Sequence, residues 1–457
     1  MKLTFYGGVQ QVTGSNYLLE KDGLKILVDC GLFQGSRFAE TLNYAPFSYN
    51  PKEIDFVFLT HSHADHSGRL PKLYKDGFRG KIFATKPTLD LAAIALDDNL
   101  DLIKDEARKD GHEPLFDSGD LHQTFLLAQR VEYQEEVNLG SGVTAIFHDA
   151  GHILGSAIIE INWHNDAGKI KSIYFSGDLG NYPVPLLRHY DMPNEADYIV
   201  VESTYGDRLH SNVTDRKEIL RQEIGKTIER GGTVLIPSFA IERTQDLLYE
   251  LNELVEQNKL PRVPVFLDSP LAIKLTKVYK NYEDYFNKKV VHEIRSGDDI
   301  FNFPGLRMTY SSQESKVIDK FNGSKIIIAG SGMSLGGRIV FHEIRYLPDP
   351  NSTIIFVGYQ VENSPGRQIL DGKKEIKLLG QHVSVNCNIR LIEGYSAHAD
   401  QGMLMDWVGK AKEDGKLKKV FITHGEYHSS SILSQKIRSE MSIDAAVPSI
   451  GESFELD

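Results

Sequence analysis

The chain has 457 residues, more than one ordinary hydrophobic core accommodates, so two domains are expected. Its hydrophobic fraction of 41% and charged fraction of 25% are typical of a globular protein, and no apolar run approaches the roughly 20 residues that span a bilayer. The net charge of −12 argues against a broad basic surface, so a polyanionic ligand would have to be held locally by metal ions and a few polar groups.

Short apolar segments alternate with turns over the first 200 residues. Strands are expected at 3–6, 16–20, 25–29 and 55–59, and helices at 70–76 and 89–107. A second series of strands is expected at 143–148, 157–163, 172–176 and 198–202. This pattern indicates sheets packed between helices.

The pattern of expected strands and helices changes at about Thr214. Helices are then expected at 217–230 and 244–257, with strands at 233–236, 263–267, 325–329 and 353–357. Strand and helix alternate here, which indicates a parallel sheet with crossover helices. The strand-rich pattern returns near Val383, so the middle segment is predicted to be a domain inserted into the first one. The expected boundaries are 1–207, 208–380 and 381–457.

The fragment His61-Ser-His63-Ala-Asp65-His66 directly follows an apolar run at 56–59 and carries three imidazoles and a carboxylate. Imidazole nitrogen and carboxylate oxygen suit zinc and neighbouring divalent metals. A strand sends successive side chains to opposite faces, so the cluster is expected on the turn after the strand. The alternative is a polar loop at a helix start with Asp65 as the cap, but four metal-competent side chains at this spacing rarely serve that purpose alone.

Other polar residues follow apolar strands in the same way. Asp29 ends the strand 25–29 and could hydrogen-bond to metal ligands and so orient them. The alternative is a simple turn aspartate. His152 lies between glycines and Asp178 follows another strand, but each alone is a weak signal. Together with the first cluster they complete two sets. His61, His63 and His152 could hold one metal, and Asp65, His66 and His424 another, with Asp178 bridging the two.

These residues carry a family resemblance. The order Asp29, His61-x-His63-x-Asp65-His66, His152 and Asp178 resembles the motif set of the metallo-β-lactamase superfamily. Three further stretches resemble the motifs of its β-CASP branch, namely Glu202-Ser-Thr-Tyr-Gly-Asp207, Ser396-Ala-His398 and Thr423-His424-Gly. The resemblance covers the whole chain and is nearest to RNA-cleaving members similar to the endonuclease subunit of the cleavage and polyadenylation specificity factor.

The resemblance implies an α/β fold, an αββα sandwich that holds two zinc ions, with manganese as the alternative metal. It also implies an inserted α/β β-CASP domain on a mainly parallel sheet, and a cleft between the two domains. Glu202 and His398 would form an acid–histidine pair beside the metals, so the catalytic set is predicted to be Asp29, Asp65, Glu202 and His398. Histidine at position 424 favours RNA over DNA, because DNA-processing members usually have valine there.

The predicted function is that of a zinc-dependent ribonuclease. Two divalent ions about 3.5–4 Å apart can hold a bridging hydroxide and stabilise the charge on a phosphodiester. Attack by external hydroxide would leave a 3′-hydroxyl and a 5′-phosphate. The sequence does not distinguish endonuclease from 5′–3′ exonuclease action. The alternatives are a small-molecule hydrolase of the thioesterase or lactonase type, a non-catalytic RNA-processing scaffold, and a DNA nuclease.

Substrate contacts are predicted from weaker signals. The glycine-rich turn that contains Ser331, Gly332 and Met333 follows a strand and could point backbone N–H groups at a phosphate. Arg243 could form a bidentate ion pair with a phosphate, although a structural ion pair with Asp246 or Glu242 is the alternative. Arg367 is a similar candidate, and Tyr205 could stack on a base unless it belongs to the core.

The remaining expectations concern the setting of the protein. Cys30 and Cys387 are the only cysteines, which argues against a disulfide framework and favours the cytoplasm. No membrane interaction is expected, because no apolar run is long enough to span a bilayer. RNA is the expected partner. Because relatives in the resembled family often pair, a homodimer is also compatible with the sequence.

Overall fold

The computed structural model describes residues 1–35, 37–211, 214–361, 363–413 and 415–457. Its contacts divide the chain into two compact units. The first unit comprises residues 1–181, 189–209 and 398–457, and the second comprises residues 182–188 and 210–397. Within the described residues, no helix is long and apolar enough to cross a bilayer. The three domain ranges expected from the sequence stay a prediction.

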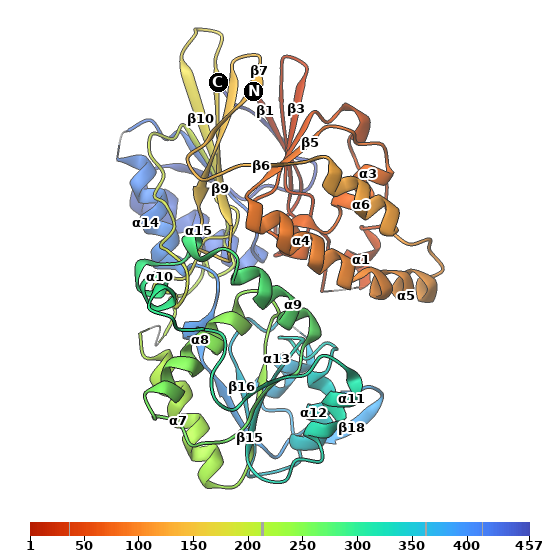
Figure 1. Ribbon diagram of the computed structural model, residues 1–457. Helices are drawn as coiled ribbons and strands as arrows, with labels where there is room; N and C mark the ends of the chain where they lie inside the picture. The colour runs from red at the N-terminus through yellow and green to blue at the C-terminus, as the bar shows by residue number, and fades with distance from the viewer. Residues whose placement is uncertain (36, 212–213, 362, 414) are drawn as a thin grey trace. The chain divides into compact units, whose positions relative to one another are not determined.

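Two seven-stranded sheets form the centre of the first unit (Figure 1). Across the first sheet the strands are β22 (Ser453–Glu455), β1 (Lys2–Gly7), β2 (Asn16–Lys21), β3 (Leu24–Val28), β4 (Phe56–Phe58), β5 (Lys81–Ala84) and β6 (Ala128–Arg130). Across the second they are β21 (Asp444–Ala446), β20 (Lys419–Ile422), β11 (Tyr198–Val201), β10 (Ile170–Phe175), β9 (Ala157–His164), β8 (Val143–Asp149) and β7 (Glu136–Gly140). In each sheet, antiparallel hairpins join a parallel run of strands.

Apolar side chains fill the space between the two sheets, among them Phe5, Trp163 and Phe175. Helices cover the outer faces: α3 (Leu70–Lys75) and α4 (Lys86–Asp98) pack on the first sheet, and α14 (Gln401–Lys412) and α15 (Tyr427–Lys436) pack on the second (Figure 1). The other helices of this unit are α1 (Arg37–Thr41), α2 (Ala64–Ser67), α5 (Leu100–Asp110) and α6 (Ser118–Leu126). The predicted αββα sandwich is therefore confirmed.

The single helix predicted over 89–107 is two helices in the structure. Asn99 ends α4 and is also the residue that precedes α5. No glycine or proline marks this position, and asparagine favours helix ends because its side chain competes for backbone hydrogen bonds. Helical periodicity on both sides of Asn99 concealed the break.

The second unit is built on a parallel sheet, as expected. Its strands are, in order, β14 (Leu306–Met308), β13 (Val265–Leu267), β15 (Lys325–Ala329), β12 (Thr233–Pro237), β16 (Thr353–Phe356) and β19 (Asn388–Leu391). A small hairpin pairs β17 (Glu375–Leu378) with β18 (Gln381–Ser384). The helices are α7 (Arg216–Glu229), α8 (Arg243–Glu256), α9 (Pro270–Tyr279), α10 (Lys288–Arg295), α11 (Ser312–Ile318), α12 (Ile339–Tyr346) and α13 (Pro365–Leu370). β19 joins this sheet although it lies beyond residue 380.

A buried carboxylate ties the carboxyl end of this sheet to α12. Asp268 follows β13 and is fully buried. It accepts hydrogen bonds from Arg338 and His342, each at 2.7 Å, and others from Thr309 and Ser315. Burial disfavours the charged form, but the hydrogen bonds outweigh burial and lower the pKa of Asp268 well below its usual range.

The substitution Asp268→Asn should destabilise the protein by about 3 kcal/mol, because it leaves the guanidinium of Arg338 without its buried anion and removes the acceptor of the His342 hydrogen bond. The measurement is the urea unfolding transition of the full chain at neutral pH. The carboxylate has a lowered folded-state pKa, so its contribution is present above pH about 4 and is lost as the pH falls further. Asp371→Asn is the matched control, because Asp371 pairs with Arg367 at the surface. Equal shifts for the two variants would contradict the assignment.

Candidate metal centre

Several strands of the first unit end in polar side chains that face one another. β3 and β4 run parallel in one sheet, and β10, β11 and β20 run parallel in the other, so their carboxyl ends gather at one edge of each sheet. The residues that follow these strands are Asp29, His61, Asp178, Glu202 and His424. His152 comes from the loop after β8. The strand-end positions read from the sequence therefore do bring the candidate ligands together.

The first group of candidate ligands consists of His61, His63, His152 and Asp178, whose ligand atoms all lie within 4.8 Å of one another. His63 Nδ1 is 3.1 Å from His61 Nε2 and 3.3 Å from His152 Nε2. Asp178 Oδ2 is 3.5 Å from the Nε2 atoms of His61 and His152. Three nitrogens and one oxygen thus lie close enough together to be the ligands of one cation with tetrahedral coordination.

The second group consists of Asp65, His66 and His424, also within 4.8 Å of one another. His424 Nε2 is 3.8 Å from Asp65 Oδ2. The other oxygen of Asp178, Oδ1, is 3.3 Å from His66 Nε2 and 3.5 Å from His424 Nε2. The two oxygens of Asp178 therefore face different groups.

The electrostatic states of His61 and Asp178 fit divalent cations. His61 is fully buried, and burial together with the neighbouring His66 lowers its pKa well below the usual value, so it is neutral as a metal ligand must be. Burial opposes the charge on Asp178, but His424, His66 and the hydrogen bond of His66 outweigh it and hold its pKa well below its usual range. Asp178 Oδ1 is buried without a hydrogen-bond partner, as is fitting for an atom that coordinates a cation.

His398 and Glu202 form a pair beside the first group. His398 Nδ1 is 3.2 Å from Glu202 Oε2, and Glu202 is fully buried. The backbone N–H groups of Leu179 and Thr204 donate to Glu202 and fix its orientation. Although burial lowers it, the charge and hydrogen bond of Glu202 raise the pKa of His398 to about 9. His398 therefore carries a proton at neutral pH.

Asp29 lies behind the second group, in contact with a residue that the sequence reasoning did not single out. The N–H and the Oγ1 of Thr60 both donate to Asp29, each at 2.8 Å, and Asp29 Oδ2 is 2.7 Å from His66 Nδ1. The backbone at Asp29 has a φ of 60°, a strained value for a residue other than glycine. Thr60 and Asp29 thus orient the His66 ring, and the position of Thr60 immediately before His61 was the available signal.

Ser15 was missed as well. Its Oγ is 3.1 Å from His424 Nδ1 and 3.4 Å from His66 Nε2, so it contacts both imidazoles of the second group. The contact with Nδ1 leaves His424 Nε2 directed at Asp178 and Asp65. A lone serine in a turn, 409 residues from its partner, gives no signal in a single sequence.

The predicted substrate residues are spread over both units. Ser331, Gly332 and Met333 follow β15 in the second unit, where Ser331 Oγ accepts from the N–H groups of Leu335 and Gly336. Arg243 is buried and pairs with Asp246 at 2.5 Å, the arrangement named as its alternative.

The other two predicted substrate residues, Arg367 and Tyr205, differ from each other in solvent exposure. Arg367 is partly exposed and pairs with Asp371 at 2.9 Å. Tyr205 belongs to the first unit, is 8% exposed, and its ring centroid lies 6.4 Å from that of His398. The substrate contacts of these two residues, and those of Arg243 and the turn at 331–333, stay predictions.

Three segments match known domains. Residues 18–175 match the Metallo-beta-lactamase superfamily domain, and residues 244–369 match the Beta-Casp domain. Residues 382–448 match the Zn-dependent metallo-hydrolase RNA specificity domain. Together these segments include most of the candidate ligands. His398 lies within the third segment, whereas Glu202 lies between the metallo-β-lactamase and Beta-Casp segments.

Curated relatives are similar over nearly the whole chain. Ribonuclease TTHA0252 of Thermus thermophilus is 36% identical over 93% of this chain and 93% of its own length. An RNase J-like protein of Methanocaldococcus jannaschii is 32% identical over 98% and 97%, and transcription termination factor FttA of Methanosarcina mazei is 30% identical over 97% and 70%. A crystal structure of a protein of unknown function from Enterococcus faecalis V583 covers 100% of this chain and 99% of its own with a TM-score of 0.56, but at 12% identity it supports the fold alone.

Ser15→Ala should weaken metal binding by about 10–100-fold, because the substitution frees the His424 ring from its orienting hydrogen bond. The measurement is competition for zinc between the full chain and a chelator. Ser62→Ala is the control: Ser62 is buried in the same motif as His61, yet its hydroxyl has no hydrogen-bond partner among the described residues. Equal affinities of the two variants would contradict the role of Ser15.

Proposed function

The chain belongs to the β-CASP branch of the metallo-β-lactamase superfamily, and we propose that it is a metal-dependent ribonuclease that hydrolyses RNA phosphodiester bonds. The observation that carries this proposal is the arrangement of two groups of ligand atoms on either oxygen of Asp178, with the pair of Glu202 and His398 beside them. The match of residues 382–448 to an RNA specificity domain and the relative named ribonuclease support RNA as the substrate.

The metals would be two zinc ions. His61, His63, His152 and Asp178 would hold one, and Asp65, His66, His424 and Asp178 the other. Such ions supply Lewis-acid activation of water and neutralise charge on the phosphodiester. Asp29 and Thr60 would keep the His66 ring in place, and Ser15 would do the same for His424.

His398 would act as the general acid. Glu202 holds the proton on Nδ1, so Nε2 is the nitrogen that can donate, and the pKa of about 9 keeps the ring charged at neutral pH. A protonated imidazole can transfer its proton to the oxygen that leaves phosphorus. We infer that this oxygen is the ribose 3′-oxygen, which gives a 3′-hydroxyl and a 5′-phosphate. Cytoplasmic RNA is the proposed substrate, and the proposal holds for a monomer or a homodimer.

His398→Ala should reduce RNA cleavage by about 10²–10⁴-fold, because the leaving oxygen loses its proton donor. The bound metal should be unchanged, because the two ligand groups can each form without His398. The measurement pairs metal analysis with cleavage of 5′-labelled RNA, and the product ladder separates internal cuts from stepwise digestion.

His63→Ala is the comparison variant, which should lose both metal and activity. Matched DNA tests the preference for RNA. Full cleavage by the His398→Ala protein would refute the general-acid assignment, and absence of cleavage by metal-loaded wild-type protein would refute the proposed function.

A further inference from the structure

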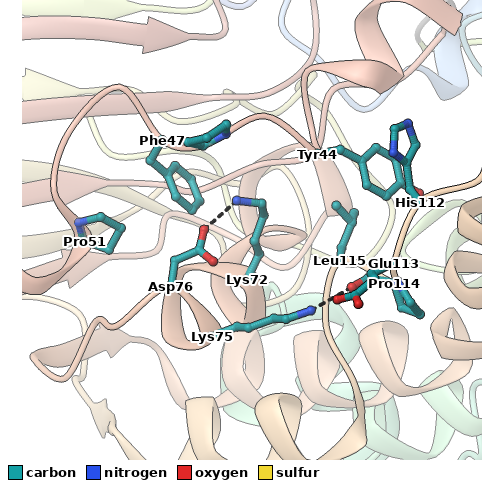
Figure 2. A pocket seen from close by; sticks show the side chains of 11 residues that line it. Tyr44, Phe47, Pro51, Lys72, Lys75, Asp76, His112, Glu113, Pro114 and Leu115 are labelled. Atoms are coloured by element: carbon teal, nitrogen blue, oxygen red, sulfur yellow. Dashed lines mark hydrogen bonds and ion pairs between the residues drawn. The ribbon is translucent and has the colours of Figure 1, made fainter.

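A cavity of about 490 Å³ lies in the first unit, and none of its lining residues belongs to the ligand groups (Figure 2). Its walls come from the loop that follows α1, from α3, and from the segment between α5 and α6. The volume falls within the roughly 300–1,000 Å³ range of small-molecule sites. α3 begins four residues after His66, so the cavity and the candidate metal centre are built on neighbouring parts of the chain.

Aromatic rings form two sides of the cavity. Tyr44 and His112 are stacked, with ring centroids 4.4 Å apart and planes at 21°. Figure 2 shows Phe47 on the other side of the view, with Lys72 between it and Tyr44. The Lys72 ammonium lies 4.4 Å from the Phe47 ring centroid, and Leu115 adds an apolar surface. Flat aromatic and apolar walls of this kind accept a planar ring system.

The polar groups of the cavity are balanced in charge. Lys72 is only 6% exposed and pairs with Asp76 at 2.6 Å, while Lys75 donates to the carbonyl of Pro114 at 2.9 Å. Glu113 also lines the cavity. Two ammonium groups and two carboxylates therefore offer both donors and acceptors without a net positive charge. A phosphate would require an excess of positive charge, whereas the edge of a nucleobase carries both acceptors and donors.

We propose that this cavity binds one unstacked nucleobase of single-stranded RNA, outside the metal centre. The base stacks on the pair of Tyr44 and His112, and its edge meets Lys72, Lys75 and the neighbouring carboxylates. Single-stranded RNA is recognised in this manner, through splayed bases on aromatic side chains. The inference rests on the proposed ribonuclease function and deepens it. A base contact of this kind does not require a basic surface and is therefore compatible with the net charge of −12.

The test is the affinity of a short single-stranded RNA for the full, metal-loaded chain, measured by fluorescence anisotropy. A His398→Ala background slows cleavage enough for the measurement. Tyr44→Ala should weaken binding by about five- to 100-fold, as loss of one base stack does. Tyr44→Phe keeps the ring and should bind as the parent does. Phe341→Ala removes an exposed aromatic ring from α12 and serves as the matched control.

Two further readouts make the outcome unambiguous. RNA that carries a photoreactive base should crosslink in the parent protein to residues 44–51 or 112–115, a result independent of how well any variant folds. The slope of affinity against salt between about 50 and 200 mM should be unchanged by Tyr44→Ala, because base contacts release no counterions.

Unchanged affinity with crosslinks elsewhere would overturn this inference while RNA cleavage by the wild-type protein still supports the proposed function. A salt slope that Lys75→Gln reduces, with no effect of Tyr44→Ala, would assign the cavity to a phosphate and would also overturn it. Failure of the wild-type protein both to bind and to cleave RNA would refute both proposals together.

Discussion

The carboxylate of Asp178 is the constraint around which the first unit is arranged. It is buried, it is charged, and each of its oxygens faces a different set of imidazoles. A charge in such a position is costly unless surrounding groups compensate for it, so several strands must end within reach of one residue. Parallel pairing of β10 with β11, and of β11 with β20, meets this requirement, because strands that run in one direction bring their carboxyl ends to the same edge. The same requirement, compensation of the buried charge of Asp178, therefore accounts for both the parallel strands of the sandwich and the residues at their ends.

Much of this could be read from the sequence because ligands that follow apolar strands leave a repeated pattern. His61, Asp178 and His424 each come directly after such a run, and parallel strands then bring them together. The contacts of Ser15 could not be read in this way, since a single hydroxyl in a turn, far along the chain from its partner, has no spacing that distinguishes it from an ordinary turn residue. The break at Asn99 was hidden for a related reason: hydrophobic periodicity records which face is buried but not whether the backbone continues. The partners of β19 depended on pairing across the sheet, which local patterns do not record.

The acidic composition and the proposed RNA substrate are compatible because recognition need not be electrostatic over the whole surface. The proposed metal centre would concentrate positive charge at the phosphodiester, and the proposed cavity with aromatic walls and balanced charge would hold a base instead of a phosphate. Both devices operate over a few ångströms, so the rest of the surface can keep its negative charge. That arrangement makes binding depend more on unpaired bases than on the backbone common to all nucleic acids.

The pairing of β1 with β22 has a consequence for how the protein is made. The first strand of the chain is completed by residues 453–455, and His424 also comes from the last part of the chain. The second unit, by contrast, forms its sheet almost entirely from residues 233–391. During synthesis the second unit can therefore complete its own sheet while the first unit still waits for its closing strands. The second ligand group is then assembled last, so we expect a nascent chain to gain full metal-binding capacity only after His424 and β22 have been synthesised.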